Sequence, residues 1–147
     1  MQPGPRVPVI CCVLIIAALL VVGTVSHGVI RHIVQTSPLW IAIVLGVRNS
    51  AFTRWAALPC FVFWLALMTA IWLYLLGWAH LISGTFSPTE IAMTIIVGAA
   101  SVVGIVNAAT SKSSGVRAIA AIATLSLVLV LQIAALRVSL LPQIAHR

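Results

Sequence analysis

Apolar runs that approach or exceed the length of a membrane-spanning helix occupy most of this chain. The hydrocarbon core of a bilayer is about 30 Å thick, and an α-helix needs about 20 apolar residues to cross it. Charged residues make up only 6% of the 147 residues, with one acid, Glu90. Soluble domains carry about 25% charged residues, so the composition excludes a soluble enzyme, a nucleic-acid-binding domain and a disordered chain. We expect an integral membrane protein that is almost entirely embedded.

The expected fold is all-α: a polytopic transmembrane helical bundle in one membrane-embedded domain over residues 1–147, with no soluble domain. Residues 7–25 are longer than the apolar region of a signal peptide and lack a clear cleavage motif, so they are assigned to a first span. We prefer five helices, at about residues 8–25, 30–47, 55–79, 88–109 and 117–141.

The second of these helices is the weakest prediction, because its purely apolar part, residues 38–47, is too short to span a bilayer alone. In the alternative arrangement four helices span the membrane, and residues 30–47 re-enter it or lie in the interface. Pro38 cannot donate a hydrogen bond to the carbonyl of Val34, so it predicts a kink or a loosened first turn in a second spanning helix.

The eight Lys and Arg residues are scattered singly, whereas nucleic-acid binding needs a clustered basic patch. We expect them to meet anionic lipid headgroups. The five-helix arrangement places five of them on one side of the membrane and three on the other. The positive-inside rule then predicts a cytoplasmic N-terminus and a C-terminus outside. The first group is Arg6, Arg48, Arg54, Lys112 and Arg117, and the second is Arg31, Arg137 and Arg147. Short loops favour a bacterial inner membrane.

Two helix ends carry local signals. Ser87-Pro88-Thr89-Glu90 has the pattern of a helix start, with Ser87 as the N-cap, Pro88 in the first helical position and Glu90 completing a capping box. In the turn at residues 26–29, Gly28 is available for a left-handed C-cap.

Helix-packing residues are predicted in the fourth span. Helices in lipid approach closely where small residues line up, and this span carries such a stripe at Gly98, Ala100, Gly104 and Ala108. We prefer packing inside the monomer, with a second copy or another membrane chain as the alternative. Gln132 in the last span is predicted to hydrogen-bond another helix.

One polar cluster is expected near the outer ends of the first four helices. Polar side chains at membrane depth are costly and are a functional hypothesis by default. Such a cluster can bind a divalent metal, hold an anionic headgroup or relay a proton, and the alternative role for Glu90 is capping alone. Its members are His27, Arg31, His32, His80 and Glu90.

No metal site and no cofactor are expected. His27 and His32 are five residues apart and would face different directions on a helix, so they do not form a helical metal pair. Cys11, Cys12 and Cys60 lie inside apolar runs and are interpreted as small packing residues.

No catalytic motif is present, and one acid cannot form a carboxylate acid/base pair, so a membrane-embedded enzyme is the least supported class. We expect a non-enzymatic accessory or scaffold subunit that packs against other membrane chains or a second copy. The alternative is a small oligomeric transporter or channel that uses the polar cluster. The motifs are generic to membrane helices and indicate no family.

Overall fold

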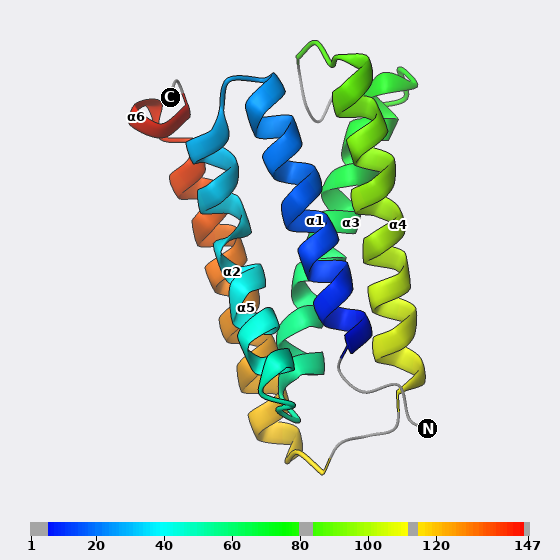
Figure 1. Ribbon diagram of the computed structural model, residues 1–147, viewed down its shortest axis with the longest axis vertical. Helices are drawn as coiled ribbons and strands as arrows, with labels where there is room; N and C mark the ends of the chain where they lie inside the picture. The colour runs from blue at the N-terminus through cyan, green and yellow to red at the C-terminus, as the bar shows by residue number, and fades with distance from the viewer. Residues whose placement is uncertain (1–5, 80–83, 112–114, 146–147) are drawn as a thin grey trace.

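The fold is an all-helical bundle. The computed structural model describes residues 6–79, 84–111 and 115–145 (Figure 1). Five of the helices in this part of the chain are long and apolar enough to cross a membrane, which confirms the predicted bundle of five spans. The helices are α1 (Arg6–Val25), α2 (Val29–Val47), α3 (Thr53–Leu75), α4 (Pro88–Thr110), α5 (Ala118–Ser139) and the short α6 (Pro142–Ala145).

The lengths of the helices suit a bilayer. α2 is the shortest of the five with 19 residues, and α3 and α4 are the longest with 23. At about 1.5 Å per residue these helices are about 29–35 Å long, against a hydrocarbon core of about 30 Å. The segment that might have been re-entrant is therefore a full-length helix within the bundle.

α2 continues through Pro38 without interruption. Proline leaves the carbonyl four residues earlier without its helical partner. Here the hydroxyl of Ser37 donates to the Val34 carbonyl at 2.8 Å. The side chain next to Pro38 thus replaces the hydrogen bond that Pro38 cannot make.

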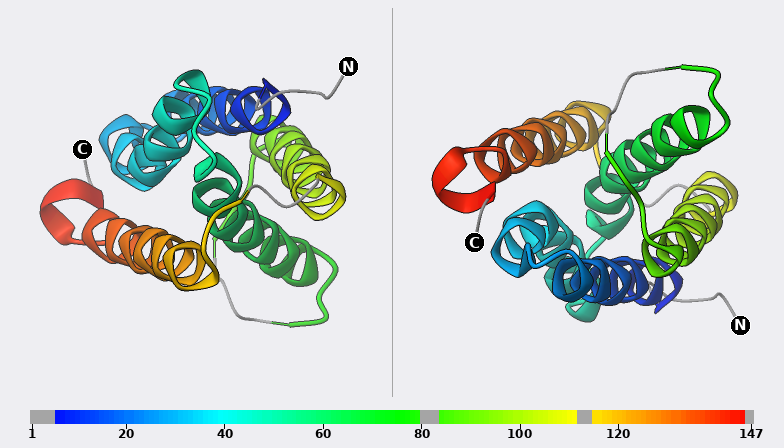
Figure 2. Two further views of the ribbon diagram at one scale, coloured as in Figure 1. Left: turned by 90° about the horizontal axis from the view of Figure 1, so that it is seen from below. Right: turned by 90° about the horizontal axis from the view of Figure 1, so that it is seen from above.

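The five long helices form a closed ring. α1 packs against α2 and α4, α3 packs against α4 and α5, and α2 packs against α5, while α2 and α3 also touch across the ring. Successive helices run in opposite directions, and the end-on views show the ring order (Figures 1 and 2). α1 and α3 therefore end where α2 and α4 begin. We call this the upper end of the bundle, as drawn in Figure 1, and the opposite end the lower end.

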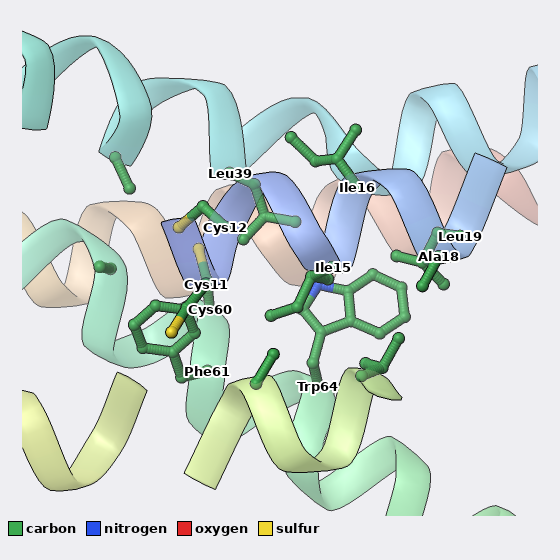
Figure 3. Packing of buried hydrophobic residues seen from close by; sticks show 14 of the residues in the cluster. Cys11, Cys12, Ile15, Ile16, Ala18, Leu19, Leu39, Cys60, Phe61 and Trp64 are labelled. Atoms are coloured by element: carbon green, nitrogen blue, oxygen red, sulfur yellow. The ribbon is translucent and has the colours of Figure 1, made fainter. Parts of the chain in front are cut away.

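The middle of the bundle is a hydrophobic core. Its largest fully buried apolar side chains are Trp64 and Phe61 of α3, Ile15 of α1 and Leu39 of α2 (Figure 3). In lipid such a core is stabilised mainly by close packing, because the surrounding acyl chains are as apolar as the core itself. The three cysteines are free and buried within it, as their apolar settings predicted: Cys11, Cys12 and Cys60.

The left-handed residue after α1 is His27, with φ of 55°. The prediction that Gly28 would take this role is wrong, because Gly28 has φ of −122° and is already the N-cap of α2. The Gly28 amide donates to the Gly23 carbonyl at 2.9 Å, the six-to-one bond of a Schellman motif. That bond places the left-handed conformation one residue earlier than expected.

α3 ends at Leu75, four residues before the predicted boundary at residue 79. Gly77 follows with φ of 73°. The Trp78 amide donates to the Leu73 carbonyl at 2.9 Å, and the Gly77 amide to the Tyr74 carbonyl at 3.0 Å. This complete Schellman motif stops the helix. The predicted boundary was too late because hydropathy continues past the residue at which the backbone geometry ends the helix.

α5 likewise ends at Ser139, two residues before the predicted boundary at residue 141. Pro142 begins α6. A proline cannot donate into the preceding helical turn, so the chain closes α5 before it and starts a new short helix.

The small residues of α4 divide between two environments. Ala100, Gly104 and Ala108 are buried inside the bundle, and a Cβ added at Gly104 would overlap the ring of Phe61 on α3. Gly98 is half-buried and a Cβ there would meet nothing within 4 Å. Three of the four predicted packing residues therefore serve contacts within the monomer, and Gly98 does not.

Candidate functional site

A cavity of about 290 Å³ opens at the upper end of the bundle. Five helices and the segment before α4 form its walls, with α5 contributing Leu136 alone. Its apolar walls come mainly from α1, α3 and α4, and its polar groups mainly from α2 and the start of α4. The lining residues are Leu19, Val22, Ser26, Arg31, His32, Gln35, Trp64, Leu67, Met68, Ile71, Gly84, Thr85, Phe86, Glu90, Met93, Thr94, Val97 and Leu136.

The predicted polar cluster is brought together in part. Arg31, His32 and Glu90 line this one cavity. His27 is exposed in the turn after α1 and is not among the lining residues. His80 lies outside the described residues. These three side chains thus come from α2 and α4. The two helices are not neighbours in the ring, and α1 packs between them.

α2 presents Arg31, His32 and Gln35 to the cavity from its first two turns. Residues four apart lie on one face of a helix, which explains why Arg31 and Gln35 share the same wall. Nδ1 of His32 lies 2.9 Å from the Gly28 carbonyl oxygen. A carbonyl only accepts, so the hydrogen-bond pattern assigns the proton to Nδ1 and leaves Nε2 toward other partners.

Gly23 of α1 gives the ring of His32 its position. A Cβ added at Gly23 would lie 3.2 Å from Nδ1 of His32 and 3.1 Å from Cα of Val29. Both separations are tighter than about nine in ten real contacts of a Cβ. The glycine therefore lets α1 and α2 approach closely at the edge of the cavity.

Glu90 is a helix cap, as predicted. The Ser87 amide donates to Oε2 of Glu90 at 2.7 Å, and the Glu90 amide donates to the Ser87 hydroxyl at 3.3 Å. Pro88 stands at the start of α4, where a missing amide hydrogen costs nothing. The carboxylate that faces the cavity is therefore already committed to the helix terminus.

Arg31 has no such partner. Its Nε is buried and makes no hydrogen bond, and no ion pair or other hydrogen bond of Arg31 occurs within the described residues. Glu90 lines the same cavity but does not form an ion pair with Arg31. Ionisable groups at membrane depth normally pair with one another or with backbone carbonyls, so an unpaired guanidinium is the unusual feature of this site.

A buried polar network lies behind Gln35. The Gln35 side-chain amide donates to the Ser139 hydroxyl of α5 at 2.9 Å, and the Gln132 side-chain amide donates to the Gln35 backbone carbonyl at 3.1 Å. All three residues are buried. The predicted hydrogen bond of Gln132 to another helix is confirmed, and it fixes α2 against α5.

Several site residues carry no signal that marks them in the sequence. Trp64 reads as a packing residue, and it is 1% exposed while it lines the cavity. Thr94 lines the cavity from α4, where it accepts a hydrogen bond from the Trp72 indole at 3.1 Å. Both positions become part of a site only when α3 and α4 pack together.

The cavity is closed toward the lower end. Along α1, α2 and α3 the residues beneath the lining are Ile15, Leu39 and Phe61, each 0% exposed. This core is continuous with Trp64. The arrangement can hold a ligand that enters from the upper end, and the packed core separates that ligand from the lower end.

Among the described residues no group of three or more His, Cys, Asp or Glu side chains is placed to hold a metal ion. Comparison of the chain with protein-family models, curated proteins and solved structures gives no match. We therefore infer the function from the geometry of the site.

Proposed function

We propose that this chain is a non-enzymatic membrane protein that binds a small ligand in the cavity at the upper end. The observation that carries the proposal is the unpaired Arg31 in the wall of an otherwise largely apolar cavity. Ligand sites are typically concave and mostly apolar, with a few polar groups that orient the ligand. A charge kept in such a place is a functional hypothesis by default.

Binding suits the geometry better than catalysis or open-channel conduction. The chain's one acid, Glu90, is engaged in a capping box, so a second carboxylate for acid/base chemistry is lacking. The buried core below the cavity favours a closed binding state over an open pore. Transport by an oligomer remains compatible with the proposal, and it would require the core around Trp64 to open.

We propose further that the protein resides in a bacterial inner membrane, with its N-terminus in the cytoplasm. The support is the distribution of Lys and Arg, five against three, which favours the lower end as the cytoplasmic one. The cavity would then open to the outside of the cell.

The test uses the full chain in lipid nanodiscs and four ligands that share an eight-carbon body: octanol, octanoate, octyl phosphate and octylammonium. The melting temperature is followed by far-UV circular dichroism. At least one ligand should raise it, because a ligand that binds only the folded state stabilises that state.

The matched control is Leu67→Trp, which fills the cavity from α3 without changing any charge. It should abolish the ligand-induced rise in melting temperature. A response of equal size in wild type and Leu67→Trp would place binding outside the cavity. No response to any of the four ligands would contradict the proposed function.

A second candidate function is the accessory-subunit role. A groove of about 400 Å³ between α1 and α4 supports it, since its walls are almost entirely apolar and it lies beside the small residues of α4. We propose a transmembrane helix of another membrane protein as its occupant. The groove is lined by Val7, Ile10, Cys11, Leu14, Ile96, Ala99, Ala100 and Val103.

The native mass after mild detergent extraction tests this second role. An assembly with other chains that is lost on Ala99→Trp would support it, because the added ring would fill the groove. A monomer, or an assembly that Ala99→Trp leaves intact, would contradict it.

A further inference from the structure

Resting on the proposed ligand-binding function, we infer that the ligand is a small amphiphile with an oxyanion, either a carboxylate or a phosphate, that binds Arg31. Its apolar body would lie against α3 and α4. The ligand's charge would then be negative, and Arg31 would be the residue that recognises it.

Arg31 has a large unmet demand for hydrogen-bond acceptors. A guanidinium offers five N–H donors and no acceptor. Nε is buried without a partner, and no acceptor within the described residues serves the rest of the group. A buried donor without an acceptor is destabilising. A carboxylate or a phosphate supplies paired acceptor oxygens in the geometry of the guanidinium fork.

Gln35 and Thr94, two polar residues of the cavity wall, are already engaged, whereas the indole N–H of Trp64 is a buried donor without a partner and would also favour an acceptor on the ligand. The Gln35 side-chain amide donates to Ser139. The Thr94 hydroxyl donates to the Ile91 carbonyl at 2.7 Å and accepts from the Trp72 indole. Arg31 is thus the group in the wall with the largest unmet hydrogen-bonding capacity.

The surroundings of Glu90 decide the sign of the ligand's charge. Glu90 would attract a cationic ligand if its carboxylate were free. Its Oε2 instead accepts from the Ser87 amide at 2.7 Å, and it lies in the first turn of α4, where the positive end of the helix dipole offsets its negative charge. The charge of Glu90 is therefore partly compensated at its own helix terminus, whereas the charge of Arg31 has no such local compensation among the described residues.

The rest of the cavity suits a ligand with an apolar body. The remaining walls are mainly apolar, and they include the flexible side chains of Met68 and Met93, which adapt to irregular shapes. The volume of about 290 Å³ lies at the lower edge of the range for ligand pockets, about 300–1,000 Å³. One short apolar chain fits this space better than the two acyl chains of a phospholipid.

The test is a titration of the full-length protein in nanodiscs of zwitterionic phosphatidylcholine, followed by tryptophan fluorescence because Trp64 lines the cavity. The same four eight-carbon ligands are compared. Octanoate and octyl phosphate should bind about tenfold or more tightly than octanol, the effect of one charge-assisted hydrogen-bonded contact. Octylammonium should bind more weakly than octanol.

Substitution identifies the recognising residue. Arg31→Gln should remove the preference for the anions, so that octanoate and octanol bind within about twofold of one another, while Arg31→Lys should keep part of the preference. The matched control is Arg137→Gln, because Arg137 is an exposed arginine of the same end that does not line the cavity. This variant should keep the full preference.

The source of the oxyanion is tested by adding phosphatidylglycerol to the nanodiscs. If a lipid headgroup occupies the site, this lipid should raise the melting temperature and weaken octanoate binding in wild type but not in Arg31→Gln. No effect of the lipid, with octanoate binding retained, would indicate a free amphiphile. Either result supports an oxyanion on Arg31.

Other outcomes overturn the inference. If octanol or octylammonium binds as tightly as the anions, the ligand is not selected for negative charge, although the cavity still binds ligands and the proposed function stands. If the anions bind preferentially in wild type and equally so in Arg31→Gln, Arg31 is not the recognising residue. If no ligand binds, the proposed function fails as well. Because the wild-type comparison needs no variant, misfolding of Arg31→Gln would not prevent the test.

Discussion

His27 has a backbone conformation that its side chain disfavours. Its φ of 55° lies in the left-handed region, which costs a residue other than glycine about 1 kcal/mol. The greater chain entropy of unfolded glycine offsets part of any gain. We therefore expect His27→Gly to raise the free energy of unfolding by about 0.5 kcal/mol, measured by thermal or denaturant unfolding in detergent.

The control for this prediction is His27→Ala, which removes the imidazole but keeps the left-handed strain. It should give no gain in stability. If alanine stabilises the protein as much as glycine does, the side chain and not the backbone is the source of the cost. Since His27 is exposed and does not line the cavity, ligand binding should be unchanged in both variants.

Single-residue features could be predicted from the sequence when their partners are close in the chain. The capping box of Ser87 and Glu90 is such a case, because its bonds join residues three apart. The unpaired state of Arg31 is not, because it depends on what α3 and α4 place around it. Local spacing also misplaced the left-handed residue at Gly28, since the exact end of α1 decides which residue takes that position.

Among the elements, α2 depends on a local substitute for one backbone hydrogen bond. The Ser37 hydroxyl donates to the Val34 carbonyl at 2.8 Å, which Pro38 leaves without its helical partner. Ser37→Ala should therefore lower the free energy of unfolding by about 1 kcal/mol. In a Pro38→Ala background the new backbone amide can donate to the same carbonyl, so Ser37→Ala should then cost little.

A double-mutant cycle measures this coupling, and we expect an interaction energy of about 1 kcal/mol. Additive effects of Ser37→Ala and Pro38→Ala would show that the hydroxyl does not replace the missing backbone bond.

The packing of α4 on α3 requires glycine at one position and not at another. A Cβ at Gly104 would overlap the Phe61 ring, whereas one at Gly98 would meet nothing within 4 Å. We expect Gly104→Ala to destabilise the protein by about 1–3 kcal/mol, as overpacking typically does. Gly98→Ala should be neutral or slightly stabilising, because alanine is the better helix former.

Adding Phe61→Leu to Gly104→Ala tests the cause by unfolding in detergent. The smaller side chain should recover part of the stability that Gly104→Ala loses. Equal losses for Gly98→Ala and Gly104→Ala would indicate that the glycines matter for reasons other than this contact.

Most of the elements were predictable because hydropathy specifies a span in lipid, although the purely apolar part of α2 is too short to span a bilayer alone. What hydropathy does not contain is the direction in which each small residue faces. Gly98 and Gly104 belong to the same predicted stripe, and only the position of α3 separates them. Hydropathy also does not contain the end of α3 at Leu75, because Gly77 stops the helix inside an apolar run.

At the scale of the whole molecule, the site is a product of the ring. The cavity needs walls from five helices, and its polar groups come mainly from α2 and α4, which α1 separates in the ring. Alternation of direction along the chain was enough to predict that Arg31, His32 and Glu90 share one end. It was not enough to predict the apolar walls or the closed core, because these depend on the order of the helices around the ring.

The orientation of the whole bundle gives the last prediction. If the N-terminus is cytoplasmic, the upper end with the cavity faces outward. Thr85 lines that end and Ala51 lies in the turn between α2 and α3 at the lower end, and both are exposed. In intact cells, a membrane-impermeant maleimide should label Thr85→Cys and leave Ala51→Cys unlabelled until the membrane is permeabilised.

The native thiols should contribute little background, because Cys11, Cys12 and Cys60 are all buried. Wild-type protein is the direct control, and it should remain unlabelled in both conditions. The opposite pattern would invert the bundle and turn the cavity toward the cytoplasm, which would leave ligand binding intact but require the amphiphile to come from inside the cell. Residues 51 and 85 are joined by the single span α3, so they should lie on opposite sides of the membrane. Labelling of both cysteines in intact cells would contradict this topology.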